Sequence, residues 1–147
     1  MKTRMLGEIE VSSIGMGCMG FSHAHGDPAP RSECIRMMRR AHELGVTLYD
    51  TADVYGDGHN EILVGEALKP IRDQVIILTK YNPERNPVSD QTKGSVEKQI
   101  EERLDASLKR LDTDYIDIYM MHRVTDDVPV SMVGEAMAKF KAKGKIR

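Results

Sequence analysis

The sequence is poor in several features that define particular classes of protein. It has no tryptophan, and aromatic residues make up only 5% of its 147 residues. It contains no run approaching the ~20 apolar residues that a membrane-spanning helix requires. Its first residues also lack the apolar segment of a secretory signal peptide. We therefore expect a soluble, globular protein with no membrane partner and a cytoplasmic location.

Charge of one sign and cysteine are also scarce. Lysine and arginine total 21 against 23 aspartate and glutamate residues, which gives a formal net charge of −2, and the two signs are interspersed. Because nucleic acid is attracted by a concentrated positive field, we expect no nucleic-acid partner. The two cysteines, Cys18 and Cys34, are too few for a disulfide framework and favour a reducing compartment.

The chain does contain a regular alternation of strand-like and helix-like segments. Apolar runs predict strands at residues 11–16, 46–49, 75–79 and 115–121. Apolar residues at helical spacing predict intervening helices around residues 32–44, 60–68, 96–111 and 133–140. The unbroken run at 75–79 is typical of parallel strands that are covered on both faces. This order predicts an α/β fold with a parallel sheet built from βαβ units.

Two architectures can complete such a sheet: an open, doubly wound sheet or a closed (β/α)8 barrel. A barrel typically takes ~250 residues, so this chain would supply its first half, with four strand–helix units. We interpret residues 1–147 as one partial barrel domain. We also expect it to be a fragment, truncated before a fifth strand that would start at residues 145–147.

Two local patterns suggest other functions. Residues 15–20, GMGCMG, match the G-x-G-x-x-G motif of dinucleotide-binding folds, but residues 21–30 contain two prolines, two histidines and a glycine and predict a loop instead of the required helix. His23 and His25, with Cys18 nearby and His42 or His59 as a distant fourth ligand, could in principle bind zinc. No paired-cysteine or HExxH motif supports that site, and a histidine-containing loop is the favoured interpretation.

A stronger candidate site is spread over three predicted strands. Asp50 ends the second strand, Lys80 the third and His122 the fourth, and Tyr55 follows on the loop after Asp50. The carboxyl ends of parallel strands lie side by side, which is where α/β folds place their sites. Each residue alone has an ordinary structural explanation, as a turn former, a solvated cation or a packing residue. Together they form a chemically complementary set.

These side chains are suited to proton transfer. A free phenol has a pKa near ~10 and is a weak acid at neutral pH, but a nearby ammonium stabilises the phenolate. Asp50 would keep Lys80 charged and oriented, and Tyr55 could then protonate a developing alkoxide while His122 orients the carbonyl oxygen. The hydride for such a reduction must come from a cofactor.

The residues around this set resemble the aldo-keto reductase family. The resemblance is carried by residues 48–56 (LYDTADVYG), 60–68 (NEILVGEAL), 78–80 (LTK), 107–111 (SLKRL), 114–119 (DYIDIY) with His122, and 15–20. It extends over essentially the whole chain, in order. It implies a (β/α)8 barrel that carries NADP(H) across its carboxyl face, and a hairpin at residues 3–10 that closes the barrel bottom.

The resemblance also implies the role of each site residue. Tyr55 would be the general acid, Lys80 and Asp50 its activating pair, and His122 the group that orients the substrate. The loop at residues 15–20 resembles the family segment that lies against the nicotinamide ribose and the substrate pocket. This implies that the cofactor-binding residues include Gly17, Cys18, Met19 and Asp50.

Two functions remain open from the sequence. The first is NADP(H)-dependent reduction of aldehydes or ketones to alcohols, with a small carbonyl compound as the substrate. The alternative is a catalytically incompetent half-barrel that acts as a binding or oligomerisation module. Exposed sheet edges invite pairing with another chain, so a homo-oligomer formed through these edges is a further expectation.

Overall fold

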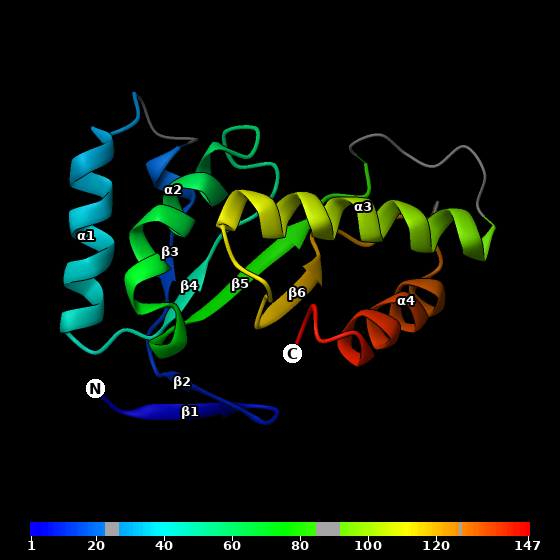
Figure 1. Ribbon diagram of the computed structural model, residues 1–147, viewed down its shortest axis with the longest axis horizontal. Helices are drawn as coiled ribbons and strands as arrows, with labels where there is room; N and C mark the ends of the chain where they lie inside the picture. The colour runs from blue at the N-terminus through cyan, green and yellow to red at the C-terminus, as the bar shows by residue number, and fades with distance from the viewer. Residues whose placement is uncertain (23–26, 85–91, 127) are drawn as a thin grey trace.

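A parallel four-stranded sheet forms the centre of the molecule (Figure 1). The computed structural model describes residues 1–22, 27–84, 92–126 and 128–147. The strands lie in the order β3 (Met16–Gly17), β4 (Leu48–Asp50), β5 (Ile76–Tyr81) and β6 (Ile118–Met121). Within the described part of the chain, each strand pairs with its neighbours in sequence and the order never reverses. A doubly wound sheet has such a reversal, so this order is that of a barrel segment.

One helix follows each strand of this sheet. The helices are α1 (Arg31–Glu43), α2 (His59–Leu68), α3 (Lys93–Leu111) and α4 (Val130–Ala142), with two short 3-10 helices at Met19–Phe21 and Lys69–Gln74. Successive helices pack against one another in a row, as Figure 1 shows. Among the described residues, no helix is both long enough and apolar enough to cross a membrane.

The helices of this chain cover only one face of the sheet. Along β5, Ile77, Thr79 and Tyr81 are buried beneath the helices, whereas the alternate residues Ile76, Leu78 and Lys80 are only partly buried. The expectation that this strand is covered on both faces is therefore wrong for the chain by itself. Its unbroken apolar run has a different cause, because the second face is the concave, inward face of a barrel segment and carries apolar residues as well.

An antiparallel hairpin lies across the amino ends of the strands. It consists of β1 (Thr3–Leu6) and β2 (Ile9–Ser12). The Ser12 amide donates to Thr47 Oγ1 at 2.8 Å, and the Thr47 amide donates to Ser12 Oγ at 2.9 Å. The expected strand at 11–16 is divided in two, because Ser12 Oγ donates to the Ile14 carbonyl at 2.7 Å and the chain bends there. The expected hairpin is present and extends to Ser12.

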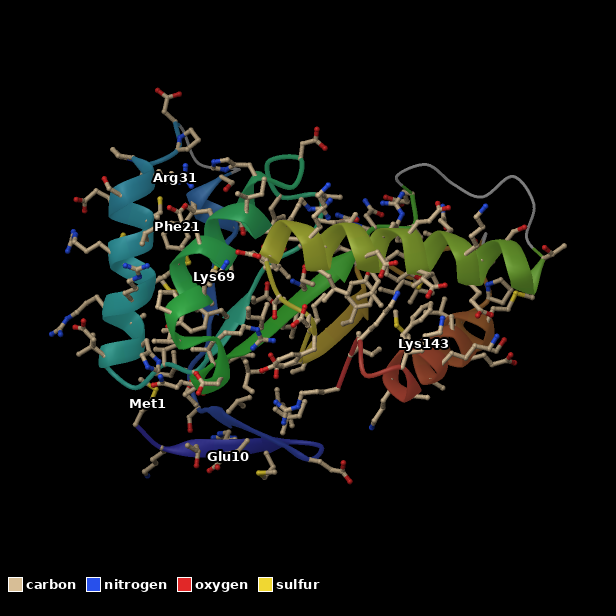
Figure 2. All side chains as sticks on the ribbon, viewed as in Figure 1. Met1, Glu10, Phe21, Arg31, Lys69 and Lys143 are labelled. Atoms are coloured by element: carbon tan, nitrogen blue, oxygen red, sulfur yellow. The ribbon has the colours of Figure 1, made fainter. Side chains whose placement is uncertain are left out.

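The core lies between the sheet and the helices. It contains Tyr49 and Ile77 from the strands, Met38 from α1 and Leu104 from α3, all fully buried. The Tyr49 hydroxyl donates to the Met38 carbonyl at 2.9 Å, which satisfies the one polar atom of this buried ring. Ion pairs join neighbouring helices at the surface. Lys143, which directly follows α4 and is labelled in Figure 2, pairs with Glu101 of α3 at 2.7 Å.

Among the described residues, no strand pairs with the outer edge of β6. Ile146 forms a parallel bridge with Ile116, at the position where the sequence predicts that a fifth strand begins. Beside it is a recess of about 590 Å³, lined largely by apolar residues of the hairpin, the strands and α4, including Ile9, Leu78, Met120 and Met137. The hairpin, the sheet edge and the last helix thus share one apolar surface.

Candidate active site

The structure brings Asp50 and Lys80 into direct contact. Asp50 is the last residue of β4, and it lies opposite Leu78 of β5. Lys80 is therefore two residues further along, and its side chain reaches back so that Nζ donates to Asp50 Oδ1 at 2.6 Å and to the Thr51 carbonyl at 2.8 Å. The Lys80 side chain is 14% exposed and that of Asp50 is 38% exposed.

Tyr55 approaches the pair from the loop between β4 and α2. Lys80 Nζ lies 5.4 Å from the centroid of its ring. Directly after Tyr55, the residues Gly56, Asp57 and Gly58 all have positive φ, of 57°, 57° and 87°. A Cβ atom on Gly56 would lie 2.9 Å from Cβ of Ser22. Glycine is therefore required at position 56, both for the turn and for the close approach of the two loops.

His122 completes the group from the end of β6. Its ring meets the Tyr55 ring edge-on, with 5.8 Å between centroids and an interplanar angle of 85°. Its amide donates to the Tyr81 carbonyl at 2.8 Å. Nδ1 is buried and has no hydrogen-bond partner among the described atoms. A buried polar atom without a partner is costly, and such atoms recur at sites where a ligand supplies the missing contact.

The charge state of His122 follows from its surroundings. Burial lowers the pKa of its imidazole below the usual value of 6.5, and the Lys80 ammonium lowers it further. Asp53 and Asp50 act in the opposite direction, and Arg123 adds a smaller lowering. Because the lowering effects win, the ring is neutral at physiological pH and offers one N–H donor and one acceptor.

The loop after β3 lies against the same strand end. The Cys18 amide donates to the Asp50 carbonyl at 2.8 Å. The Cys18 side chain is fully buried, and burial raises the pKa of its thiol to about 12, so it packs in the core as an unreactive thiol. Gly17 is exposed, with open space where a side chain would begin, and Met19 is half-buried. Accessible backbone at the Asp50 end of the site is therefore provided by Gly17.

A buried amide that the sequence analysis did not single out holds this loop in place. Asn60 Nδ2 donates to the Cys18 carbonyl at 2.8 Å and to Ser22 Oγ at 2.9 Å. Its Oδ1 accepts from Thr51 Oγ1 at 2.7 Å. The signal in the sequence was the placement of two polar residues, Asn60 and Glu61, in the first turn of a helix whose remaining residues are mostly apolar. Both side chains are buried in the structure.

Glu61 and Asp53 anchor the site to α3. Glu61 is fully buried; its carboxylate accepts from Thr79 Oγ1 of β5 at 2.6 Å and from Arg110 Nε of α3 at 2.6 Å. Asp53 pairs with Arg103 Nη1 of the same helix at 3.2 Å. Neither acidic residue was assigned a role from the sequence, because periodicity does not reveal which partner a buried charge will meet.

The glycine motif does not form the dinucleotide site that it suggests, and the histidine motif falls outside the described residues. Only the short 3-10 helix Met19–Phe21 overlaps the end of the glycine motif, and α1 begins at Arg31. These glycines therefore do not open an α-helix as a dinucleotide-binding fold requires. His23 and His25 lie outside the described residues. In the described ranges, no group of three or more His, Cys, Asp or Glu side chains could hold a metal ion.

The model of the aldo/keto reductase family matches residues 13–147 of the sequence. The chain belongs to the aldo-keto reductase family. It is 37% identical over 148 residues to an NADP(+) aldo-keto reductase of Schizosaccharomyces pombe, and it covers 43% of that protein. This family membership confirms the resemblance inferred from the sequence motifs.

Solved structures of aldo-keto reductases have the same fold. The holo form of an enzyme from Bacillus halodurans matches with a TM-score of 0.80 and 36% identity over 100% of this chain and 48% of its own. An enzyme from Klebsiella pneumoniae in complex with NADPH matches with a TM-score of 0.77 and 34% identity, over 94% of this chain and 44% of its own. The chain thus has the fold of half an aldo-keto reductase barrel, which confirms the predicted fold class. It spans about two fifths of the length of the curated relatives it matches.

Proposed function

We propose that this aldo-keto reductase chain carries the proton-transfer groups for NADP(H)-dependent reduction of aldehydes or ketones to alcohols. The observation that supports the proposal most directly is the 2.6 Å contact between Lys80 Nζ and Asp50 Oδ1, with Tyr55 and His122 in ring contact beside it. Four complementary groups meet at the carboxyl end of a parallel sheet, where barrel enzymes carry their chemistry.

In this proposal, Tyr55 is the general acid. The Lys80 ammonium, 5.4 Å from the ring centroid, favours the negatively charged phenolate that forms when Tyr55 gives up its proton. Asp50 holds that ammonium in place through the 2.6 Å contact of its Oδ1 with Lys80 Nζ. The proton therefore moves from the Tyr55 hydroxyl to the developing alkoxide oxygen of the substrate.

His122 orients the carbonyl group. As a neutral ring with a buried, unpartnered Nδ1, it can form a hydrogen bond to a ligand without adding a second positive charge next to Lys80. A carbonyl oxygen placed between Tyr55 and His122 would be bound by both side chains. Preorganised donors at the position where negative charge develops stabilise the transition state.

The residues present fit one end of a nicotinamide cofactor. Open space at Gly17, beside the half-buried Met19 and the partly exposed Asp50 carboxylate, leaves room for a ribose at the β3–β4 edge of the site. The Cys18 side chain is buried and supports this surface from below. When bound, NADPH supplies the hydride that a carbonyl reduction needs. The choice of NADP(H) is supported by the relatives from Schizosaccharomyces pombe and Klebsiella pneumoniae.

A second candidate, a binding or oligomerisation module, is favoured by the open edge of the sheet. β6 pairs with β5 on one side, and in the described chain no strand pairs with its other side; the bridge between Ile116 and Ile146 lies just before β6. Unpaired strand edges beside apolar surface are templates for association with another chain. In this candidate the catalytic groups are present but no turnover occurs.

The two candidates are separated by measuring NADPH binding by fluorescence and aldehyde-dependent NADPH oxidation with the wild-type chain and Tyr55→Phe. We expect the variant to bind NADPH as the wild type does and to lose ~10²- to 10⁴-fold in kcat, the usual contribution of a general acid. The matched control is Tyr115→Phe. The Tyr115 ring lies under Arg72 at the amino end of the sheet, so this substitution should leave turnover unchanged.

Unchanged turnover in Tyr55→Phe would refute the assigned acid. If the wild-type chain shows no NADPH binding at high micromolar cofactor, the reductase proposal fails for this chain. Sedimentation analysis of the same sample then shows whether the chain associates through its open edge, as the second candidate requires.

A further inference from the structure

Asp53 is hydrogen-bonded to the backbone on either side of Tyr81, the last residue of β5. It lies on the loop between Asp50 and Tyr55 and is only 4% exposed. Its amide donates to the Lys80 carbonyl at 3.0 Å. Its carboxylate accepts from the Asn82 amide, at 3.2 Å to Oδ1 and 3.4 Å to Oδ2. One residue thereby fixes the backbone before and after the point where β5 ends.

A buried cation holds the Asp53 carboxylate in turn. Arg103 Nη1 of α3 lies 3.2 Å from Oδ2, and the two side chains are 14% and 5% exposed. Desolvating two charges is costly, and replacing such a pair by apolar residues is often neutral or stabilising. The pair is therefore better explained by the geometry that it imposes than by the stability that it adds.

The opposite end of β5 carries an equivalent arrangement. Asp117 accepts from the Ile77 amide at 3.0 Å and pairs with Arg72 Nη2 at 2.8 Å. Its side chain is 0% exposed and that of Arg72 is 14% exposed, close to the values for Asp53 and Arg103. The same chemistry thus fixes both ends of one strand, but only the Asp53 end lies beside the candidate catalytic groups. Substitution of Asp117 is therefore a control for substitution of Asp53.

We propose that Asp53, held by Arg103, is a positioning residue that fixes the carboxyl end of β5 so that Lys80 meets Asp50 and Tyr55. The inference rests on the proposed function for its catalytic consequence. Its structural content stands on the contacts of Asp53 with the Lys80 carbonyl and the Asn82 amide. No contact between Asp53 and a substrate is involved.

The charge of Asp53 gives the proposal a spectroscopic signature at His122. Of the charged groups around this imidazole, Lys80 and Arg123 lower its pKa, whereas Asp53 and Asp50 raise it. Burial is the largest lowering influence, and the Tyr55 ring packs against the imidazole edge-on. Replacing Asp53 with a neutral residue removes one of the two raising charges and should lower the pKa of His122 further.

The test compares Asp53→Asn with Asp117→Asn in the full chain, by NMR and by steady-state kinetics. For Asp53→Asn we expect a shifted Asn82 amide resonance, a lower pKa of His122 and a kcat reduced by ~10- to 100-fold, as for a catalytic group moved by less than about 1 Å. NADPH affinity should stay unchanged, because the lost alignment acts in the transition state. Asp117→Asn should shift the Ile77 amide and leave the His122 titration and kcat as in the wild type.

Equal effects of both variants on His122 and kcat would overturn the proposal, because the role would then be general stability. An unperturbed Asn82 amide and His122 titration in Asp53→Asn would overturn it as well. If Asp53→Asn does not fold, Arg103→Lys replaces it: this variant keeps both charges but loses the guanidinium geometry, and a positioning role requires the Asn82 shift and a reduced kcat. The NMR results stand even if the wild-type chain has no reductase activity, so failure of the proposed function is distinguished from failure of this inference.

Discussion

The two ends of the parallel sheet use the same kinds of residue in opposite ways. At the amino end, the Asp117 carboxylate is 0% exposed and is bound by Arg72, Arg147 and the Ile77 amide. At the carboxyl end, the Asp50 side chain is 38% exposed, and His122 keeps a buried nitrogen without a partner among the described atoms. One end satisfies its charges internally, whereas the other leaves hydrogen-bonding capacity unused.

We interpret this difference as a separation between stability, at the amino end, and the proposed function, at the carboxyl end. Polar groups that are fully satisfied rigidify a fold, and departures from that rule are expected at functional sites. The Asp53–Arg103 pair combines the two properties: its charges are satisfied within the protein, as at the amino end, yet it borders the candidate site at the carboxyl end. Changes at the amino end should therefore alter stability, and changes at the carboxyl end should alter turnover.

The largest effect on stability should come from Asp117→Ala. It leaves Arg72, which is 14% exposed, without its buried counter-ion and leaves the Ile77 amide without an acceptor. Removing one partner of a buried ion pair typically costs ~3–5 kcal/mol. The measurement is the free energy of unfolding in urea. Asp114→Ala, at an exposed position of the same segment, is the control and should change it by less than about 0.5 kcal/mol.

A stability loss in Asp117→Ala of the same size as in Asp114→Ala would contradict the assignment of the amino end as the stabilising end. A loss of NADPH affinity in the folded fraction of Asp117→Ala would contradict the separation of the two ends.

Gly65→Ala should reduce the free energy of unfolding by a smaller amount. Gly65 lies where α2 meets the end of α3. A Cβ atom at Gly65 would lie 2.5 Å from the Leu111 carbonyl oxygen, so the two helices must separate. Overpacking of this kind costs ~1–3 kcal/mol. At Gly134 of α4, nothing lies within 4 Å of the added Cβ, and Gly134→Ala should stabilise the chain by up to ~1 kcal/mol. Urea unfolding of both variants measures the contrast, and equal destabilisation would refute the close approach of α2 and α3.

The smallest effect concerns the pH dependence of stability at the carboxyl end. The pKa of His122 is lowered in the folded state from its usual 6.5, so the unfolded chain binds more protons as the pH falls through this range. Stability is then fully present above about 6.5, decreases as the pH falls through the interval between the two pKa values, and does not decrease further below the folded value. The comparison of wild type with His122→Gln at about pH 5.5 and about pH 8 isolates this contribution. A variant with the same pH dependence as the wild type would show that His122 does not contribute to it.

Sequence reasoning predicted the order of elements and the convergence of Asp50, Lys80 and His122, because parallel topology alone brings strand ends together. It could not give the register. Asp50 lies level with Leu78, and Lys80 with Met120, so the contact depends on a lysine reaching back over two residues. An apolar run does not specify such a stagger, because a shift of the pairing by two residues keeps the same side chains on the same face.

The supporting network was the main omission. Asp53, Asn60 and Glu61 all lie within the motifs that carry the family resemblance, but their partners come from distant segments. Asp53 pairs with Arg103, Asn60 with the Cys18 carbonyl, and Glu61 with Thr79 and Arg110. Three-dimensional packing decides which charged side chains pair with each other, and amphipathic periodicity does not contain that information. The hairpin was predicted in the right place, but its predicted end at residue 10 is too early, because the pairing continues to Ser12 opposite Thr3.

The ion pair of Lys80 with Asp50, and the ring contacts with Tyr55 and His122, all arise within residues 50–122. A geometry contained in one continuous stretch is inherited as a unit. On the proposed function, mutations outside residues 50–122 can alter substrate binding while these four side chains keep their contacts. In evolutionary terms, such a stretch can persist as one unit while the segments around it diverge.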